Sequence, residues 1–204
     1  MGKILNGILG PVDGKIGSVV GFQWKGIPAI RSYAIPANPQ TVGQQANRSV
    51  FSDLVFMGRA LLSSVLQPYW DPFQTKMSGF NRFMQVNKIA MGSTYDDSLL
   101  KIAEGQLEVS GDFTSDYSTP NAIFNWTEAV SQNGELTDNV IAMVTTGPGG
   151  EYWISVGEAT RDDEALNIPI GTGYESTDLH FYLAFYRGSG ESLLVSNTEY
   201  ALFT

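Results

Sequence analysis

The first 35 residues carry a strand-like pattern of apolar positions. Residues 14–35 read GKIGSVVGFQWKGIPAIRSYAI, in which two runs rich in Val, Ile and aromatic residues flank the dipeptide Lys25-Gly26. This dipeptide favours a tight turn, and Pro28 is tolerated at the start of a strand, so the pattern predicts a β-hairpin. Because an isolated two-stranded hairpin is marginally stable in water, we expect it to dock on another surface.

From Thr41 the pattern changes to the period of a helix. Pro39 disfavours a helix before it, and Thr41 followed by Gln44 has the form of a capping box, so a loop enters a helix here. An apolar stripe then repeats at helical spacing. Its members are Phe51, Leu54, Val55, Gly58, Leu61, Leu62 and Val65. The sequence therefore predicts an amphipathic helix that is capped by Thr41 and Gln44.

A second helical pattern follows Pro68 and Pro72, which end the first. In the segment SGFNRFMQVNKIAM the helical spacing is repeated by Phe80, Phe83, Met84, Asn87 and Ala90. Two helices joined by a short, proline-broken connection pack as a helical hairpin. We predict such a hairpin for residues 41–101.

From about Gly105 the period becomes that of β-strands. Seven runs rich in β-branched and aromatic residues are separated by Gly, Pro, Asn and Asp: QLEVS, AIFNWT, NVIAMVTT, EYWISVG, LNIPI, LHFYLAFYR and LLVSNTEYALF. Seven such strands predict an immunoglobulin-like or fibronectin-like β-sandwich. Its core is expected to contain Trp126, Leu179, Phe181, Leu183 and Phe185, with His180, Tyr182, Ala184 and Tyr186 on the opposite strand face.

Together these patterns predict a mixed, mainly β fold in three parts. Residues 1–40 form an N-terminal arm with the β-hairpin, residues 41–101 form the helical hairpin, and residues 102–204 form the β-sandwich domain. A chain of 204 residues with 43% hydrophobic residues is long enough to bury one good core.

Charge is divided unevenly along the chain. Residues 1–101 hold ten basic and five acidic residues, a net charge of +5, whereas residues 102–204 hold two basic and sixteen acidic residues, a net charge of −14. The basic residues are scattered singly and form no cluster that would neutralise several phosphates. Complementary packing against an acidic surface of the same or another subunit is therefore favoured over nucleic-acid binding.

Composition excludes several kinds of chemistry and targeting. The chain has no Cys, so disulfides, zinc–thiolate sites and Cys nucleophiles are excluded. The apolar patch in MGKILNGILGPVDG is interrupted by Asn6 and Gly7 and no cleavage site follows, so no signal peptide is predicted. No run approaches the roughly 18 apolar residues of a membrane helix, so no membrane span is predicted.

No residue set indicates a catalytic or metal site. His180 is the only histidine, which excludes a two-His metal site, and nothing indicates the partners that a Ser-His-Asp arrangement would need. An ordinary surface or half-buried histidine is favoured. In RDDEAL the adjacent acids Asp162, Asp163 and Glu164 lack the alternating spacing and the glycine of a calcium loop, so a solvated loop is favoured.

No cofactor site is predicted either. GPVDGKIGS lacks the spacing of a phosphate-binding loop, and Ile16 stands where that loop needs Ser or Thr. TGPGGE and RGSGES indicate tight turns between strands. The four tryptophans, Trp24, Trp70, Trp126 and Trp153, are favoured as core or interface residues over a sugar-binding platform.

Four segments carry a resemblance: GKIGSVVGFQWKG, NPQTVGQQANRSVF, GFNRFMQVNK and LVSNTEYA. Together they resemble a family of unknown function that is widespread in Bacteroidota, whose members share G-K-x-G-x-V-x-G-x-x-W-K-G followed by N-P-x-T-x-x-Q-x-x-x-R-x-x-F. Gln40 departs from the Arg that many members have, so no basic contact is implied there. The N-terminal segments are also similar to segments of phage structural proteins. The resemblance covers essentially the whole chain, implies a shared fold and leaves the activity open.

We therefore expect a non-enzymatic structural or assembly subunit, with a phage virion component (a head, neck or tail protein) as the first hypothesis. Its partners would be copies of itself and other structural subunits, and its location the virion, or the bacterial cytoplasm before assembly. The residues expected to make assembly contacts are Val19, Phe22, Trp24, Ile30 and Tyr33.

Two alternatives remain open. A bacterial surface or carbohydrate-binding module with a glycan ligand would be favoured by aromatic residues that converge with polar groups. Nucleic-acid binding would need the basic residues to converge on one face.

Overall fold

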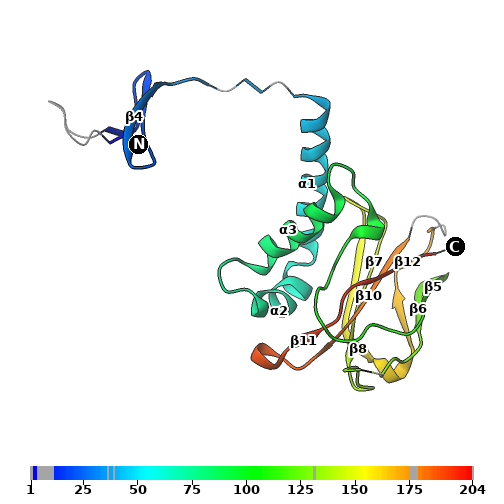
Figure 1. The fold of residues 1–204 in the computed structure, drawn as a ribbon. Helices are drawn as coiled ribbons and strands as arrows, with labels where there is room; N and C mark the ends of the chain where they lie inside the picture. Colours follow the sequence, from blue (N-terminus) through cyan, green and yellow to red (C-terminus); the bar gives the residue numbers. More distant parts are fainter. Residues whose placement is uncertain are drawn as a thin grey trace. The chain divides into compact units, whose positions relative to one another are not determined.

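Figure 1 shows the computed structural model, which describes residues 2–3, 12–35, 37–38, 40–130, 132–174 and 179–203. The fold is mixed and mainly β, with 35% strand and 29% helix, and the described residues form three antiparallel sheets and three α-helices. The chain divides into two compact units, residues 1–40 and residues 41–204. Each unit is described by itself.

The N-terminal unit is a small antiparallel sheet rather than a lone hairpin. Its strands, in spatial order, are β1 (Gly2–Lys3), β2 (Val12–Ile16), β3 (Val19–Trp24) and β4 (Ile27–Ser32). The run expected as one strand is split between β2 and β3, because Gly17 turns the chain at φ 56°. The predicted β3–β4 hairpin is present, and Lys25 (φ 50°) and Gly26 (φ 83°) have the left-handed conformations that a tight hairpin turn requires.

The C-terminal unit begins with a helical layer. Its elements are α1 (Val42–Ala60), a π-helical turn (Leu62–Leu66), α2 (Gln67–Tyr69), a 3₁₀ turn (Asp71–Phe73), α3 (Gly79–Met91) and a second 3₁₀ turn (Asp97–Leu99). Thr41 is the N-cap of α1, and its Oγ1 accepts a hydrogen bond from the backbone N of Gln44 at 3.4 Å. The chain bends by 67° between α1 and the segment Leu62–Phe73.

Helices α1 and α3 approach closely at a glycine. A Cβ atom added at Gly58 would lie 2.8 Å from Cε2 of Phe80 and 3.2 Å from Cε1 of Phe83. No side chain fits there without displacing an aromatic ring of α3. The missing side chain at Gly58 therefore sets the distance between the two helices.

The buried face of α1 differs from the predicted stripe. Phe51 is 53% exposed and Leu62, just beyond α1, is 37% exposed, so their assignment to that stripe was wrong. The buried positions follow i, i+4, i+7, i+8 and i+11: Val50, Leu54, Met57, Gly58 and Leu61. Apolar residues flank this stripe on both sides, and the packing partners decide which of them are covered.

The rest of the C-terminal unit forms two antiparallel sheets. The three-stranded sheet has the order β5 (Phe113–Ser118), β6 (Asn121–Trp126) and β9 (Ala165–Pro169). The five-stranded sheet has the order β11 (Leu194–Val195), β10 (His180–Arg187), β7 (Asn139–Thr145) and β8 (Tyr152–Thr160), and β12 (Glu199–Leu202) also pairs with β10. Short 3₁₀ turns lie at Arg161–Asp163 and Gly190–Ser192.

The central strands β7 and β10 are covered on both faces. Figure 1 shows α1 and α3 on one side of β7, β8 and β10, and β5 and β6 on the other side. Ile141, Met143, Tyr182 and Ala184 pack with the helices in one core. Alternate residues, among them Val140, Val144, Leu179, Phe181, Leu183 and Phe185, pack with Phe124 and Trp126 of β6 in the second core. The predicted core position of Trp126, Leu179, Phe181, Leu183 and Phe185 is confirmed.

Two strand assignments were wrong. QLEVS, residues 106–110, is not a strand but contributes one isolated bridge from Leu107 to Ser196. The carbonyls of Glu108 and Val109 accept hydrogen bonds from the buried Arg161 guanidinium instead of a neighbouring strand. Conversely, β5 lies in a polar segment that was expected to be a turn, and its alternation leaves only every second side chain partly buried.

The helices share a core with the five-stranded sheet, and both belong to one compact unit. Leu54, Met57 and Phe83 from the helical layer pack with Met143 and Tyr182 from the five-stranded sheet. The predicted division into separate domains at residues 101 and 102 stays a prediction.

Candidate functional site

One face of the N-terminal sheet gathers aromatic and basic side chains. Trp24 is paired with Ile27 across the hairpin, and Phe22 lies two residues earlier in β3, so the three share a face. Trp24 and Ile27 are each 61% exposed. Three cations lie over aromatic rings of this face: Lys15 at 3.7 Å from the Tyr33 centroid, Lys25 at 5.4 Å from Trp24 and Arg31 at 5.9 Å from Phe22.

The opposite face of the same sheet is also apolar. Val19 is paired with Ile16, and Ile30 of β4 lies on the same side, two residues before the partner of Val19. All three side chains are exposed. The predicted assembly residues thus separate into Phe22, Trp24 and Tyr33 on the cationic face and Val19 and Ile30 on the other face.

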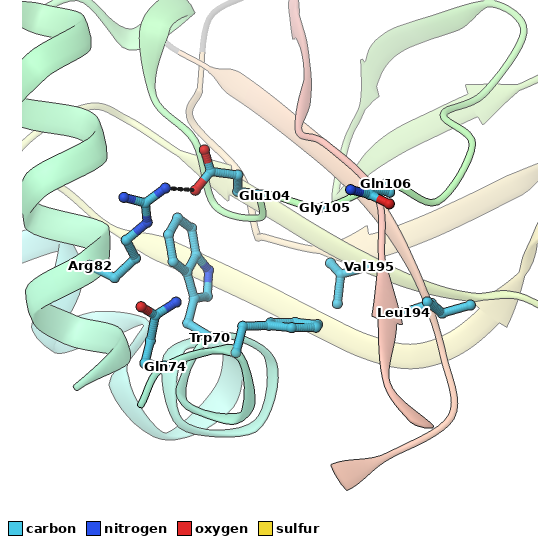
Figure 2. Close-up of a pocket in the computed structure, with 9 residues that line it drawn as sticks. Trp70, Gln74, Arg82, Glu104, Gly105, Gln106, Leu194 and Val195 are labelled. Atoms are coloured by element: carbon cyan, nitrogen blue, oxygen red, sulfur yellow. Dashed lines mark hydrogen bonds and ion pairs between the residues drawn. The ribbon is translucent and has the colours of Figure 1, made fainter. Parts of the chain in front are cut away.

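A pocket of about 310 Å³ lies in the C-terminal unit (Figure 2). The helical layer supplies one wall, including Trp70 and Arg82, and β11 supplies the other through Leu194 and Val195. The remaining lining residues are Phe73, Gln74, Glu104, Gly105 and Gln106.

The floor of the pocket is held by Trp70. Its indole Nε1 donates a hydrogen bond to the carbonyl of Ile102 at 2.8 Å, and its ring packs edge-on against Phe83. Trp70 is only 3% exposed, whereas Phe73 and Leu194 are 47% and 44% exposed. The two exposed side chains give the pocket an apolar mouth.

The polar side of the pocket is an ion pair. Arg82 Nη2 lies 3.0 Å from Oε2 of Glu104, and each side chain is about one third exposed. Such an exposed pair adds little stability, so these charges are available to orient a ligand. Gly105 follows Glu104 and packs directly on the carbonyl of Val195, where any side chain would clash.

The single histidine lies between an acid and a phenol. His180 Nε2 is 3.6 Å from Oδ2 of Asp97, and His180 Nδ1 is 2.9 Å from the hydroxyl of Tyr200. Burial raises the pKa of Asp97, and the nearby His180 and a hydrogen bond from Tyr182 oppose that rise. Within the described residues, the polar partners of His180 are therefore a carboxylate and a phenol.

The RDDEAL segment has a structural centre that the sequence did not indicate. Arg161 is fully buried, and its guanidinium lies 3.9 Å from the Phe185 ring centroid and 3.2 Å from Oδ2 of Asp138. Arg187 also pairs with Asp138, at 2.8 Å. Asp163 is exposed and caps its turn through Thr160. In this segment the acidic residues are exposed, as expected for a solvated loop, but Arg161 is buried in the core.

Residues 11–201 match a single protein family model. The chain belongs to DUF6266, a family of unknown function. No curated protein and no solved structure matches it. The hairpin face, the pocket and the His180 cluster of this DUF6266 chain all lie within the matched residues.

The described residues lack two kinds of feature. No group of three or more His, Cys, Asp or Glu side chains is placed to hold a metal ion in that part of the chain. No single helix within the same ranges is both long enough and apolar enough to cross a membrane.

Sequence reasoning missed the pocket because its walls are far apart in the chain. Phe73 and Arg82 come from the helical region, and Leu194 comes from a two-residue edge strand near the other end. One signal was present: Trp70 and Phe73 surround Pro72 in YWDPF, where aromatic residues stand in a turn. We interpreted the prolines only as the end of a helix.

Proposed function

We propose that this DUF6266 chain is a non-enzymatic structural subunit that assembles with copies of itself and other structural subunits through its N-terminal unit. A virion component is our first hypothesis for the host assembly. The observation that carries the proposal is a four-stranded sheet with large exposed hydrophobic side chains on both faces.

A sheet normally buries at least one face against another layer. The exposed side chains on its two faces include Trp24, Ile27, Tyr33, Ile16 and Ile30. Exposed apolar patches of this kind mark interaction sites. A partner that covers the sheet is the simplest explanation of its composition.

Charge supports a partner that resembles the C-terminal unit. Residues 1–40 hold four basic residues and one acid, a net charge of +3, whereas residues 41–204 hold eight basic residues and twenty acids, a net charge of −12. Opposite charges favour encounters between the N-terminal unit of one copy and the C-terminal unit of another. The net charge of −9 for the whole chain disfavours a polyanionic partner.

Assembly of the full chain tests the proposal. We expect a concentration-dependent increase in mass by light scattering, and particles or filaments in electron micrographs. Trp24→Ala should reduce assembly while leaving the unfolding midpoint nearly unchanged, because Trp24 is largely exposed. The neighbouring Gln23→Ala, on the other face, is the matched control. A chain that stays monomeric at all concentrations contradicts the proposal.

Strand order supports a finer proposal about the fold. In chain order, the first, second and fifth strands of residues 113–202 form one sheet, and the fourth, third, sixth, seventh and eighth strands form the other, the last two both pairing with the sixth. This division of strands between two sheets supports a fibronectin-like sandwich. We propose that fold for the two sheets, with the helices added on the outer face of the larger one. An experimental structure tests it.

A carbohydrate-binding module is the second candidate function, favoured by the pocket. Phe73 offers an exposed ring, and the polar residues Gln74, Arg82, Glu104 and Gln106 line the same pocket. Screening on a glycan array tests this candidate, with Phe73→Ala as the variant expected to lose binding. Equal signals from both proteins would reject it.

A further inference from the structure

The turn of the β3–β4 hairpin carries exposed side chains that could insert into a pocket. Trp24 and Ile27 face each other across the turn and are each 61% exposed. Lys25, between them, holds its ammonium group 5.4 Å from the Trp24 ring centroid. The tip therefore presents one large aromatic ring, one aliphatic side chain and one positive charge on a tight turn.

The pocket of the C-terminal unit has the matching properties. Its volume of about 310 Å³ is at the lower end of the range for small-ligand pockets, roughly 300–1,000 Å³. It can hold an indole and a neighbouring side chain. Phe73 and Leu194 give it exposed apolar lining, and Figure 2 shows Leu194 across the pocket from Glu104, whose Oε2 contacts Arg82.

We propose that the hairpin tip of one copy, residues 24–27, docks in the pocket of a second copy. Trp24 fills the apolar space against Phe73 and Leu194, and Lys25 meets the Oε1 side of Glu104. The net charges of +3 and −12 on the two units favour this pairing over one between two C-terminal units. This inference rests on the proposed function and names the surface that the arm uses.

The contact joins two different surfaces, so it is head-to-tail. Each copy keeps one tip and one pocket available to the next copy. Head-to-tail contacts close into rings or extend into filaments, depending on the rotation between copies. One type of contact therefore suffices to build a many-membered assembly.

Engineered cysteines test the contact, because the native chain contains none. A protein that carries Ile27→Cys is mixed with a second protein that carries Gln74→Cys or Gln106→Cys, and the mixture is oxidised. A disulfide requires Cα atoms within about 7 Å, so a mixed dimer reports that the tip is in the pocket. Neither variant alone should give comparable dimer.

Two matched controls define the background. Ser32→Cys lies at the far end of β4, roughly 17 Å from Ile27 at about 3.3 Å per residue, and is paired with the same pocket variants. Thr114→Cys lies on the exposed side of β5, in the three-stranded sheet, and is paired with Ile27→Cys. Adding Trp24→Ala to Ile27→Cys should lower cross-linking roughly 30-fold, as for an interface hot spot.

The outcomes separate the inference from the proposed function. Mixed dimers at the pocket positions well above both controls support the contact. If the protein assembles but the pocket pairs give no more dimer than Thr114→Cys, the inference falls and the proposed function stands. The inference is also overturned if the double variant Ile27→Cys with Gln106→Cys forms its disulfide only within one chain. It is overturned as well if a glycan binds in a Phe73-dependent manner and leaves assembly unchanged. If the protein never assembles, both the inference and the proposed function are rejected.

Discussion

The two units of the chain bury their hydrophobic residues to very different degrees. Among the described residues of the N-terminal unit, only Gly14 and Gly21 are buried, and the large apolar side chains are exposed. The C-terminal unit buries whole aromatic side chains, such as Phe83, Phe124 and Phe181, in two cores. The buried apolar surface that stabilises a fold therefore lies mainly in residues 41–204, whereas the large apolar side chains described in residues 1–40 face solvent.

The largest effect on stability is expected from Arg161→Ala. Removing the guanidinium leaves Asp138 buried with one fewer cation and also leaves the carbonyls of Glu108 and Val109 without their donor. We expect the free energy of unfolding to fall by about 3–5 kcal/mol. Denaturant unfolding measures it. Arg82→Ala, which breaks an exposed pair, should cost about 1 kcal/mol or less; equal losses for both variants would contradict the role of burial.

The next largest effect is expected from Gly58→Ala. The new methyl group meets Phe80 at the helix crossing, so the unfolding free energy should fall by about 1–3 kcal/mol. Gly43→Ala, in the same helix, is the matched control, because a Cβ atom there contacts nothing within 4 Å. That variant should be neutral or gain up to about 1 kcal/mol from helix propensity. If both variants shift the unfolding midpoint in the same direction, the close approach at Gly58 does not explain its effect.

A smaller effect is expected at the start of the C-terminal unit. Thr41→Ala removes the hydroxyl that accepts the Gln44 N–H and should cost about 1 kcal/mol. Thr41→Ser keeps the hydroxyl and should retain most of that stability. Neither variant should change assembly by the N-terminal unit, and a loss of assembly would show that the two units are coupled at this residue.

The smallest effect is a change in pH dependence at Asp97. Burial raises the pKa of this carboxyl in the folded protein, so its contribution to stability is full below the ordinary Asp pKa and is lost as pH rises through the raised pKa. Asp97→Asn cannot ionise. The variant should therefore gain stability relative to the wild type as pH rises above the ordinary Asp pKa of about 4.

The neighbouring acid provides a control of opposite sign. Hydrogen bonds from Ser98 lower the pKa of Asp96, so its contribution is present above the ordinary Asp pKa and lost as pH falls. Asp96→Asn should lose stability relative to the wild type over the same rise in pH. Parallel pH profiles for the two variants would show that burial does not set the Asp97 pKa.

Local patterns predicted most of the elements, whereas packing between distant segments determined which elements are neighbours. Turn chemistry at Lys25-Gly26 and the alternation in β10 were sufficient to place the hairpin and one core. The second core was not predictable, because the alternate residues Tyr182 and Ala184 are covered by helices distant in sequence. The same non-local packing separated Phe51 from Val50 and concealed the pocket, since no local pattern relates Trp70 to Leu194.

The double burial of β10 also constrains how the chain acquires its fold during synthesis. Leu54 and Met57 leave the ribosome long before Tyr182, their neighbour in the first core. Contacts between such distant segments form slowly, because a long loop must close before they are made. Until β10 has been synthesised, the apolar stripe of α1 lacks its partners in the five-stranded sheet. Apolar surface left uncovered in this way is prone to aggregation during synthesis.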